Sequence, residues 1–177
     1  METGEAFDAG ARDRAGARML DPELRVQHAR ELAWRALNRR ERTVAEMARI
    51  LAAKRVEPAV IEEVVGELVE QGFVDDARFA RQFAEERRRL DSWGTERIER
   101  RLRALGIGRE ELAGALEAQP HAEELEAALA VLRRRFPVPP STPRDCERAL
   151  GVLVRKGYGL ELAHDALRRH TGVRELD

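Results

Sequence analysis

Residues 97–116 read RIERRLRALGIGREELAGAL, and a related copy lies 51 residues to either side of them. The copies read EMARILAAKRVEPAVIEEVV (46–65) and RALGVLVRKGYGLELAHDAL (148–167). Their apolar positions coincide in columns, which hold Met47, Ile98 and Ala149; Leu51, Leu102 and Leu153; Val56, Ile107 and Tyr158; and Val65, Leu116 and Leu167. A fixed period of this size is typical of repeat proteins, in which one unit cannot bury its apolar face without neighbours.

Almost every segment after Asp21 has helical periodicity, and no clear alternation of period two is present. Helix starts are indicated at Asp21-Pro22, Thr43 with Glu46, Pro58, Gly94-Thr95 and Thr142-Pro143. Helix ends are indicated by Gly72, Gly106 and Gly157, and Arg55 occupies the column of the last two. The first helix carries Leu24, His28, Leu32 and Leu37 on one side, which we expect to face the core.

These patterns predict an all-α fold: a tandem array of three three-helix repeats, each similar to a helix-turn-helix domain, in an elongated or curved arrangement. The expected boundaries are a disordered N-terminal tail (1–20) and repeats at 21–72, 73–119 and 120–177.

Composition narrows the functional class. Of the 177 residues, 37% are charged and 5% aromatic, and the net charge of −1 argues against a dedicated nucleic-acid binder. The single cysteine, Cys146, excludes an intramolecular disulfide, fits a reducing compartment and lies on a predicted buried stripe. No segment approaches the roughly 20 apolar residues of a membrane span, and the N-terminus does not resemble a signal peptide. We therefore expect a cytoplasmic protein.

The sequence offers no catalytic or metal-binding pattern. Asp75-Asp76 precedes a predicted helix, where adjacent acids are explained by capping and by the helix dipole. The four histidines have no ligand spacing, and no phosphate-binding loop or nucleophile motif is present. We expect no enzyme activity, no cofactor and no metal.

Charge alternates along the array. Residues 57–76 and 110–126 contain acids and no Lys or Arg, whereas residues 78–109 and 133–156 each carry a net charge of +5. Such blocks are commonly solvated helix faces, but their recurrence in two successive repeats favours a basic strip that binds a partner or DNA. The candidate residues are Arg78, Arg81, Arg87, Arg88, Arg89, Arg97, Arg100, Arg101, Arg133, Arg134 and Arg135. Trp93 is either an exposed anchor or a residue packed at a turn.

The string GFVDDARFARQFAEERRRLDSWGTERIERRLRALGI (72–107) resembles the signature of the RecX family of bacterial recombination regulators. The matching positions, which we expect to be structural, are Gly72, Phe73, Asp75, Asp76, Phe79, Ala80, Gly94, Ile98, Leu102, Gly106 and Ile107, with Arg87 in the Arg-rich segment. The resemblance extends over residues 22–170. It departs from the family pattern at residues 90–93 and in the Pro-rich link 137–143.

This resemblance implies a modulator of DNA repair and homologous recombination, connected with the SOS response, rather than an enzyme. Family members bind the RecA–single-stranded-DNA filament in its groove, and inhibit filament extension, ATP hydrolysis and strand exchange. We expect the same partner here, a monomeric state, and at most weak direct binding to DNA. The main contact surface is expected on the second and third repeats, with the first acting chiefly as scaffold.

Two alternatives remain open. A direct DNA binder would place one helix-turn-helix unit in a major groove, but the starts of the candidate recognition helices are mostly acidic or apolar. A purely structural helical adaptor would leave the basic blocks without a role.

Overall fold

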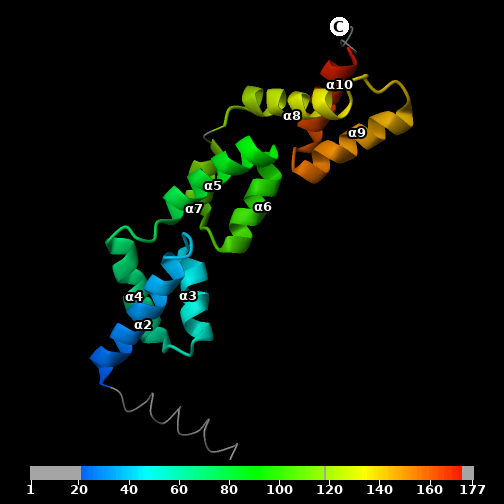
Figure 1. Cartoon of the computed structure of the whole chain (residues 1–177). Helices are drawn as coiled ribbons and strands as arrows, with labels where there is room; N and C mark the ends of the chain where they lie inside the picture. The colour runs from blue at the N-terminus through cyan, green and yellow to red at the C-terminus, as the bar shows by residue number, and fades with distance from the viewer. Residues whose placement is uncertain (1–20, 118, 173–177) are drawn as a thin grey trace, which may run out of the picture. The chain divides into compact units, whose positions relative to one another are not determined.

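The computed structural model describes residues 21–117 and 119–172, so the predicted disordered tail lies outside the described residues (Figure 1). In these two ranges the chain forms helices and no strands, as expected for the all-α class. The helices are α2 (Pro22–Leu37), α3 (Val44–Ala53), α4 (Pro58–Glu70), α5 (Asp76–Asp91), α6 (Thr95–Leu105), α7 (Arg109–Glu117), α8 (His121–Arg135), α9 (Pro143–Lys156) and α10 (Leu160–Thr171).

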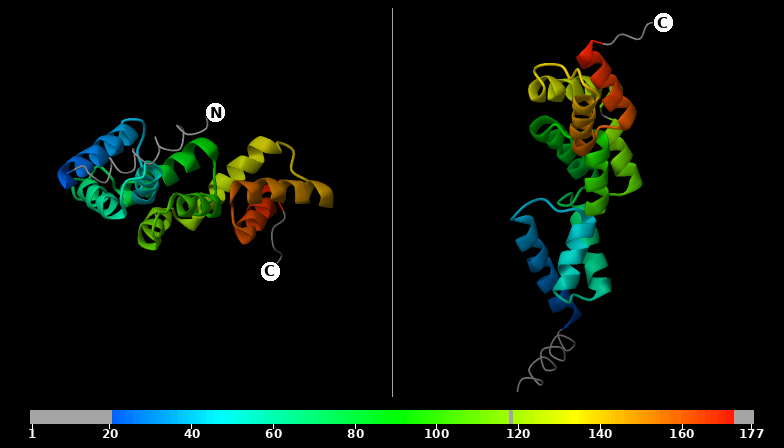
Figure 2. Two further views of the ribbon diagram at one scale, coloured as in Figure 1. Left: turned by 90° about the horizontal axis from the view of Figure 1, so that it is seen from below. Right: turned by 90° about the vertical axis from the view of Figure 1, so that its right-hand side faces the viewer.

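The chain divides into two compact units, the first ending at Asp75 and the second beginning at Asp76. In the first unit, α2, α3 and α4 pack against one another around one hydrophobic cluster (Figures 1 and 2). The second unit holds two such trios. Helices α5, α6 and α7 enclose one cluster, and α8, α9 and α10 enclose another. The prediction of three-helix repeats is therefore confirmed.

The 51-residue period corresponds to one recurring turn. Arg55, Gly106 and Gly157 all have a left-handed backbone, with φ of 63°, 88° and 90°. The residue after each donates its amide to the carbonyl five positions back, at 3.2 Å (Val56 to Leu51), 3.1 Å (Ile107 to Leu102) and 3.2 Å (Tyr158 to Leu153). This is the hydrogen bond of a Schellman helix end. The three leucines that accept it are all fully buried, so the turn and the core repeat together.

Arg55 is the one member of this column that is not glycine, and a left-handed conformation costs a residue with a Cβ about 1–2 kcal/mol. Arg55→Gly removes this strain, but glycine loses more chain entropy on folding than arginine does, which offsets part of the gain. We therefore expect the variant to stabilise the first unit by up to about 1 kcal/mol. Urea unfolding followed by circular dichroism measures this shift. Lys54→Gly is the matched control, because Lys54 has φ −89° and glycine there should destabilise by about 0.5–1 kcal/mol. Destabilisation by both variants would contradict the strain argument.

Several predicted caps are confirmed. Thr43 and Glu46 form a complete capping box at the start of α3. The side chains of Asp21 and Thr142 cap α2 and α9, each followed by Pro at the first helical position. These signals are short-range, which is why the sequence alone located these three helix starts.

The predicted core face of α2 is confirmed only for Leu32 and Leu37, which pack against the hydrophobic cluster of the first unit. Leu24 is 52% exposed and His28 is exposed, while Leu32 and Leu37 are only partly buried. The buried face is instead lined by small residues, namely Val26, Ala29, Ala33 and Ala36. Small side chains let α3 and α4 approach α2 closely, so packing selects the alanine stripe over the larger leucines.

Candidate partner-binding interface

All eleven arginines of the predicted basic strip belong to the second unit. Helix α5 carries Arg78, Arg81, Arg87, Arg88 and Arg89; α6 carries Arg97, Arg100 and Arg101; and α8 carries Arg133, Arg134 and Arg135. Three consecutive residues of a helix point in different directions. The clusters 87–89 and 133–135 therefore do not present all their guanidinium groups to one surface.

Arg87 is held by its own helix and by aromatic rings. Its guanidinium lies 2.6 Å from the Asp91 carboxylate and 5.5 Å from the centre of the Phe83 ring. The side chain is 28% exposed. Arg87 therefore stabilises the end of α5 and is already engaged before any partner arrives.

Arg88 is also partly buried. Its guanidinium donates to the carbonyl of Ala115 in α7 at 3.4 Å, and its Nε atom is buried with no partner among the described residues. Burial lowers the pKa of Arg88, and the charges of Glu124 and Glu123 partly offset this effect. Arg88 thus links α5 to α7 rather than extending to solvent.

Arg97 stacks on Trp93, with its guanidinium carbon 4.2 Å from the ring centre, and donates to the carbonyl of Arg155 at 3.1 Å. Trp93 also meets the Phe83 ring edge-on at a centroid distance of 6.2 Å. Of the two readings of Trp93, the packed residue at a turn is correct.

Five of the predicted arginines are exposed and, within the described residues, make no hydrogen bond or ion pair: Arg81, Arg89, Arg101, Arg134 and Arg135. Arg100 is exposed and donates only to a carbonyl of its own helix, at 3.3 Å. Arg133 lies 3.7 Å from Glu126 with both side chains 62% exposed, a pair that contributes little stability. Arg78 is half-buried.

The exposed arginines of α5 lie along one face. At about 100° per residue, Arg81 and Arg89 fall within about 80° of each other; Arg89 lies opposite the buried Ala80 and Ala84, and Arg81 borders them, about 60° from Ala84. On α6, Arg100 lies opposite the buried Ile98 and Leu102, whereas Arg101 flanks them, about 60° from Ile98. Guanidinium groups in this position can bind carboxylates or phosphates with two parallel hydrogen bonds.

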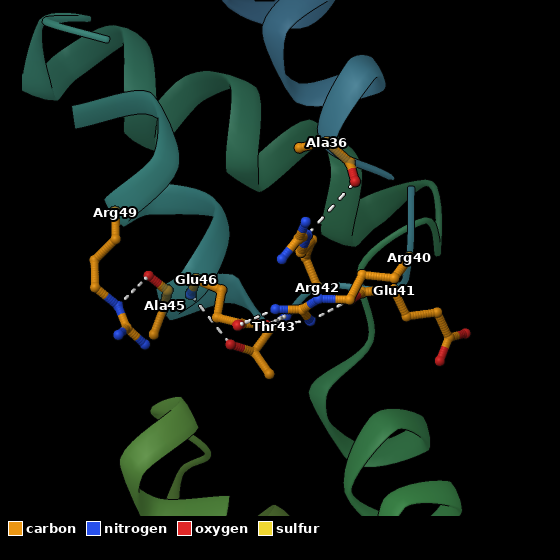
Figure 3. Close-up of polar contacts among 8 residues, drawn as sticks. All are labelled: Ala36, Arg40, Glu41, Arg42, Thr43, Ala45, Glu46 and Arg49. Atoms are coloured by element: carbon orange, nitrogen blue, oxygen red, sulfur yellow. Dashed lines mark hydrogen bonds and ion pairs between the residues drawn. The ribbon is translucent and has the colours of Figure 1, made fainter. Parts of the chain in front are cut away.

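Several arginines of the first unit form ion pairs with carboxylates of the same unit. Arg25 pairs with Glu57 at 2.8 Å, and Arg30 donates to Glu67 at 2.7 Å, so α2 is tied to the start and the middle of α4. Arg40 binds the carboxylate of Glu46 at 2.6 Å, beside the Thr43 cap (Figure 3). These three arginines of the first unit are therefore held by carboxylates of the same unit.

Glu46 has several partners (Figure 3). Burial alone would raise its pKa, but the hydrogen bond and charge of Arg40 and the Thr43 amide outweigh burial, so the pKa is lowered. A carboxyl whose pKa is lowered in the folded state contributes stability at pH values above its unfolded-state pKa of about 4.3. This stability is lost as the pH falls through the folded-state pKa.

We expect Glu46→Gln to cost less than about 1 kcal/mol at pH 7, because Gln still completes a capping box and the Arg40 pair is half-exposed. The variant should lose less stability than the parent between about pH 5 and pH 3. Thermal unfolding across this pH range measures the difference. Parallel curves for parent and variant would show that Glu46 does not carry the acid sensitivity.

Most residues of the signature motif lie in the second repeat, whereas Gly72 and Phe73 belong to the first unit. Ala80, Ile98, Leu102 and Ile107 are buried in its core, and Phe79 stacks on Phe83 at 6.1 Å. Gly72 and Gly106 have positive φ, and Gly94 is buried. Asp75 directly precedes α5 and Asp76 is its first residue, both half-buried. Phe73 is 47% exposed, and its ring centre lies 4.5 Å from that of Trp34. The buried residue of this segment is Val74, which is not among the motif positions.

Residues 21–117 and 119–172 contain no group of three or more His, Cys, Asp or Glu side chains arranged to hold a metal ion. Among the same residues, no helix has the length and apolar character needed to cross a membrane.

Sequence reasoning missed the residues that join α6 to the third repeat. They include Glu124, Lys156 and Tyr158, whose polar atoms contact residues 91–95. The sequence feature that could have indicated this contact is the pair Gly94 and Gly157, whose backbones approach each other closely. We interpreted the first only as a helix break and the second only as a helix end.

Comparison with known proteins agrees with the resemblance to the RecX family. Family models for the first and second three-helix domains of RecX match residues 29–68 and 75–116. The chain is 34% identical to the regulatory protein RecX of Leptothrix cholodnii over 136 residues, covering 77% of this chain and 85% of the relative. It is 29% identical to that of Thermobifida fusca over 162 residues, covering 90% of this chain and 88% of the relative.

Solved structures show the same fold. The crystal structure of RecX from Lactobacillus salivarius superposes with a TM-score of 0.75 at 16% identity, over 84% of this chain and 98% of that one. A second crystal structure of a regulatory protein RecX gives a TM-score of 0.69 at 19% identity, over 96% of this chain and 81% of that one. With the sequence relatives above, these matches establish that the chain belongs to the RecX family of regulatory proteins.

Proposed function

We propose that this protein binds the RecA–single-stranded-DNA filament and inhibits filament extension, ATP hydrolysis and strand exchange, without catalysing a reaction itself. The observation that carries the proposal is membership of the RecX family, to which the regulatory proteins of Leptothrix cholodnii and Thermobifida fusca belong. The exposed arginines of α5, α6 and α8 supply a surface for such a partner.

The proposed contact is electrostatic. Arg81, Arg89 and Arg101 have no carboxylate partner within the described residues, so binding an acidic protein surface or a phosphate does not require breaking an ion pair. The planar guanidinium is suited to both ligands, and each such contact makes binding depend on salt. We propose that the protein acts as a monomer in the cytoplasm.

Direct reading of duplex DNA is the second candidate, and the local chemistry disfavours it. A recognition helix places its first residues against base edges and phosphates. Here α4 begins after Glu57, the first turn of α7 holds Glu110 and Glu111, and that of α10 holds Glu161. Carboxylates at these positions repel phosphate.

A binding experiment with three matched ligands separates the candidates. Fluorescence anisotropy would compare bare single-stranded DNA, duplex DNA and RecA filament assembled on the same single strand with a non-hydrolysable ATP analogue. The proposal predicts the tightest binding to filament. Equal affinity for filament and bare single strand would favour a direct DNA binder, and no binding to any of the three would favour a structural adaptor.

A further inference from the structure

Within the second unit, the turn between α5 and α6 meets the end of α9, and the two are joined through backbone atoms. The amide of Gly94 donates to the carbonyl of Lys156 at 2.9 Å, and the amide of Glu96 donates to the carbonyl of Gly157 at 3.0 Å. Figure 1 shows this turn beside the C-terminal end of α9. The start of α6 thus uses the next repeat as its hydrogen-bond partner.

We call this contact, between residues 91–97 of the second repeat and residues 155–158 of the third, the joint. Side chains from both repeats add hydrogen bonds to it. From the third repeat, Lys156 donates to the carbonyl of Asp91 at 2.6 Å and Tyr158 donates to the carbonyl of Ser92 at 3.2 Å. From the second repeat, Arg97 donates to the carbonyl of Arg155 at 3.1 Å. Every acceptor is a main-chain carbonyl, so each of these side chains holds the backbone of the facing repeat.

Helix α6 begins at Gly94-Thr95, as the sequence indicates, but no side chain of its own caps it. Its N-cap is Gly94, which has no side chain, and the free amide of Thr95 is bound at 2.8 Å by the carboxylate of Glu124 in α8. The first amides of a helix need an acceptor and favour a negative charge. The third repeat therefore completes a helix of the second.

The joint leaves no room for a side chain at either glycine. A Cβ on Gly94 would overlap the carbonyl oxygen of Gly157 and lie 2.5 Å from the amide nitrogen of Tyr158, far inside the usual contact distance of about 3.5 Å. Gly94 has φ −79° and ψ 166°, values open to any residue. The close approach of the third repeat is thus the only backbone-level reason for glycine at this position. A Cβ on Gly157 would collide with Arg97 in the same way.

Polar groups at the joint are partly withdrawn from water. Burial lowers the pKa of Lys156, helped by the charges of Arg134 and Arg97, and opposed by Asp91. Burial raises the pKa of Tyr158 to about 12. Cations of the second and third repeats therefore lie close enough to influence one another across this contact.

We propose that this joint locks the second and third repeats into one rigid body, and that Gly94 is a positioning residue that sets the spacing between the exposed arginines of α5 and α6 and those of α8. The functional half of this inference rests on the proposed filament binding. Two sets of cations at a fixed spacing lose less freedom on binding than two sets that move independently, so the joint raises affinity without touching the partner.

The test is Gly94→Ala, because this change is tolerated by the backbone of α6 and acts only through the neighbouring repeat. Gly114→Ala is the matched control: the same substitution in the same unit, at a position where a Cβ would have nothing within 4 Å. Spin labels at Ala104→Cys in α6 and Ala130→Cys in α8, both exposed, report the distance between repeats in a Cys146→Ala background. Circular dichroism checks that helix content is kept.

We expect one narrow distance distribution for the parent and for Gly114→Ala, and a shifted or broadened one for Gly94→Ala, with filament affinity reduced roughly tenfold. A parent-like distribution for Gly94→Ala would overturn the rigid joint. A broadened distribution with parent-like affinity would overturn the positioning role. If Gly94→Ala does not fold, Glu124→Ala, which removes only the borrowed cap, is measured in its place with the same criteria. Failure of the parent itself to bind filament would count against the proposed function, while the distance measurement alone would still decide the joint.

Discussion

Replacing Arg81, Arg89 and Arg101 together by Glu is expected to weaken binding to RecA filament by about 100-fold. The three side chains are exposed and make no hydrogen bond or ion pair within the described residues, so the substitutions remove contacts with a partner and not contacts of the fold. A loss of about 1 kcal/mol for each charged contact gives about 3 kcal/mol in total, which corresponds to about two decades in affinity. Titration of labelled filament at several salt concentrations measures the change.

The salt dependence gives an independent readout. If the three arginines bind phosphates, the plot of log affinity against log salt should become shallower by about three. The control reverses Arg35, Arg39 and Lys54, three exposed cations of the first unit, and so changes the net charge by the same amount. An equal loss of affinity in this control would mean that net charge matters and the proposed surface does not.

Arg88 and Arg97 are unsuitable for this experiment although they belong to the same predicted strip. Arg88 is bound to Ala115 of α7, and Arg97 is stacked on Trp93 and bound to the carbonyl of Arg155. Reversing either charge would disturb the packing of the second unit, and a loss of binding would then have two explanations.

Leu102→Ala is expected to destabilise the second unit by about 3 kcal/mol. Leu102 is fully buried among α5, α6 and α7, and its carbonyl accepts the hydrogen bond that closes the Gly106 turn. Truncating a buried leucine removes apolar contact and leaves a cavity, which together cost about 2–5 kcal/mol. Hydrogen exchange read by mass spectrometry should show about 100-fold faster exchange of the most protected amides of α5 to α7.

The matched control for this prediction is Leu90→Ala. Leu90 is 60% exposed at the end of α5, so its truncation should change stability by no more than about 0.5 kcal/mol. Peptides of α2 to α4 should exchange at the parent rate in both variants, because their core is a separate cluster. Equal destabilisation by the two leucine variants would contradict the assignment of Leu102 to the core.

The elements of this fold that the sequence predicts correctly are those with local causes. A capping box at Thr43, a Pro after Thr142 and a glycine at position 106 act within a few residues, and each lies where the sequence indicates. The core face of α2 was predicted only in part, because alanines carry a weak hydrophobic signal, while close helix packing favours their small size.

The candidate surface is less predictable than the fold for a physical reason. Arg88 and Arg89 are neighbours in one arginine run, yet one is held against α7 and the other is exposed. The difference depends on packing between helices, which the charge pattern does not record. The sequence did not predict the joint because its residues lie far apart in the chain; Tyr158 and Ser92, for example, are separated by 66 positions. Taken with its immediate neighbours alone, Gly94 indicates only a helix break.

If this protein restrains RecA as we propose, the effect should appear in the rate of single-stranded-DNA-dependent ATP hydrolysis by RecA as the purified chain is added. We expect progressive inhibition that is strong at stoichiometric concentration and much weaker for the variant with Arg81, Arg89 and Arg101 reversed. An unchanged hydrolysis rate at stoichiometric concentration of the folded, full-length chain would contradict it.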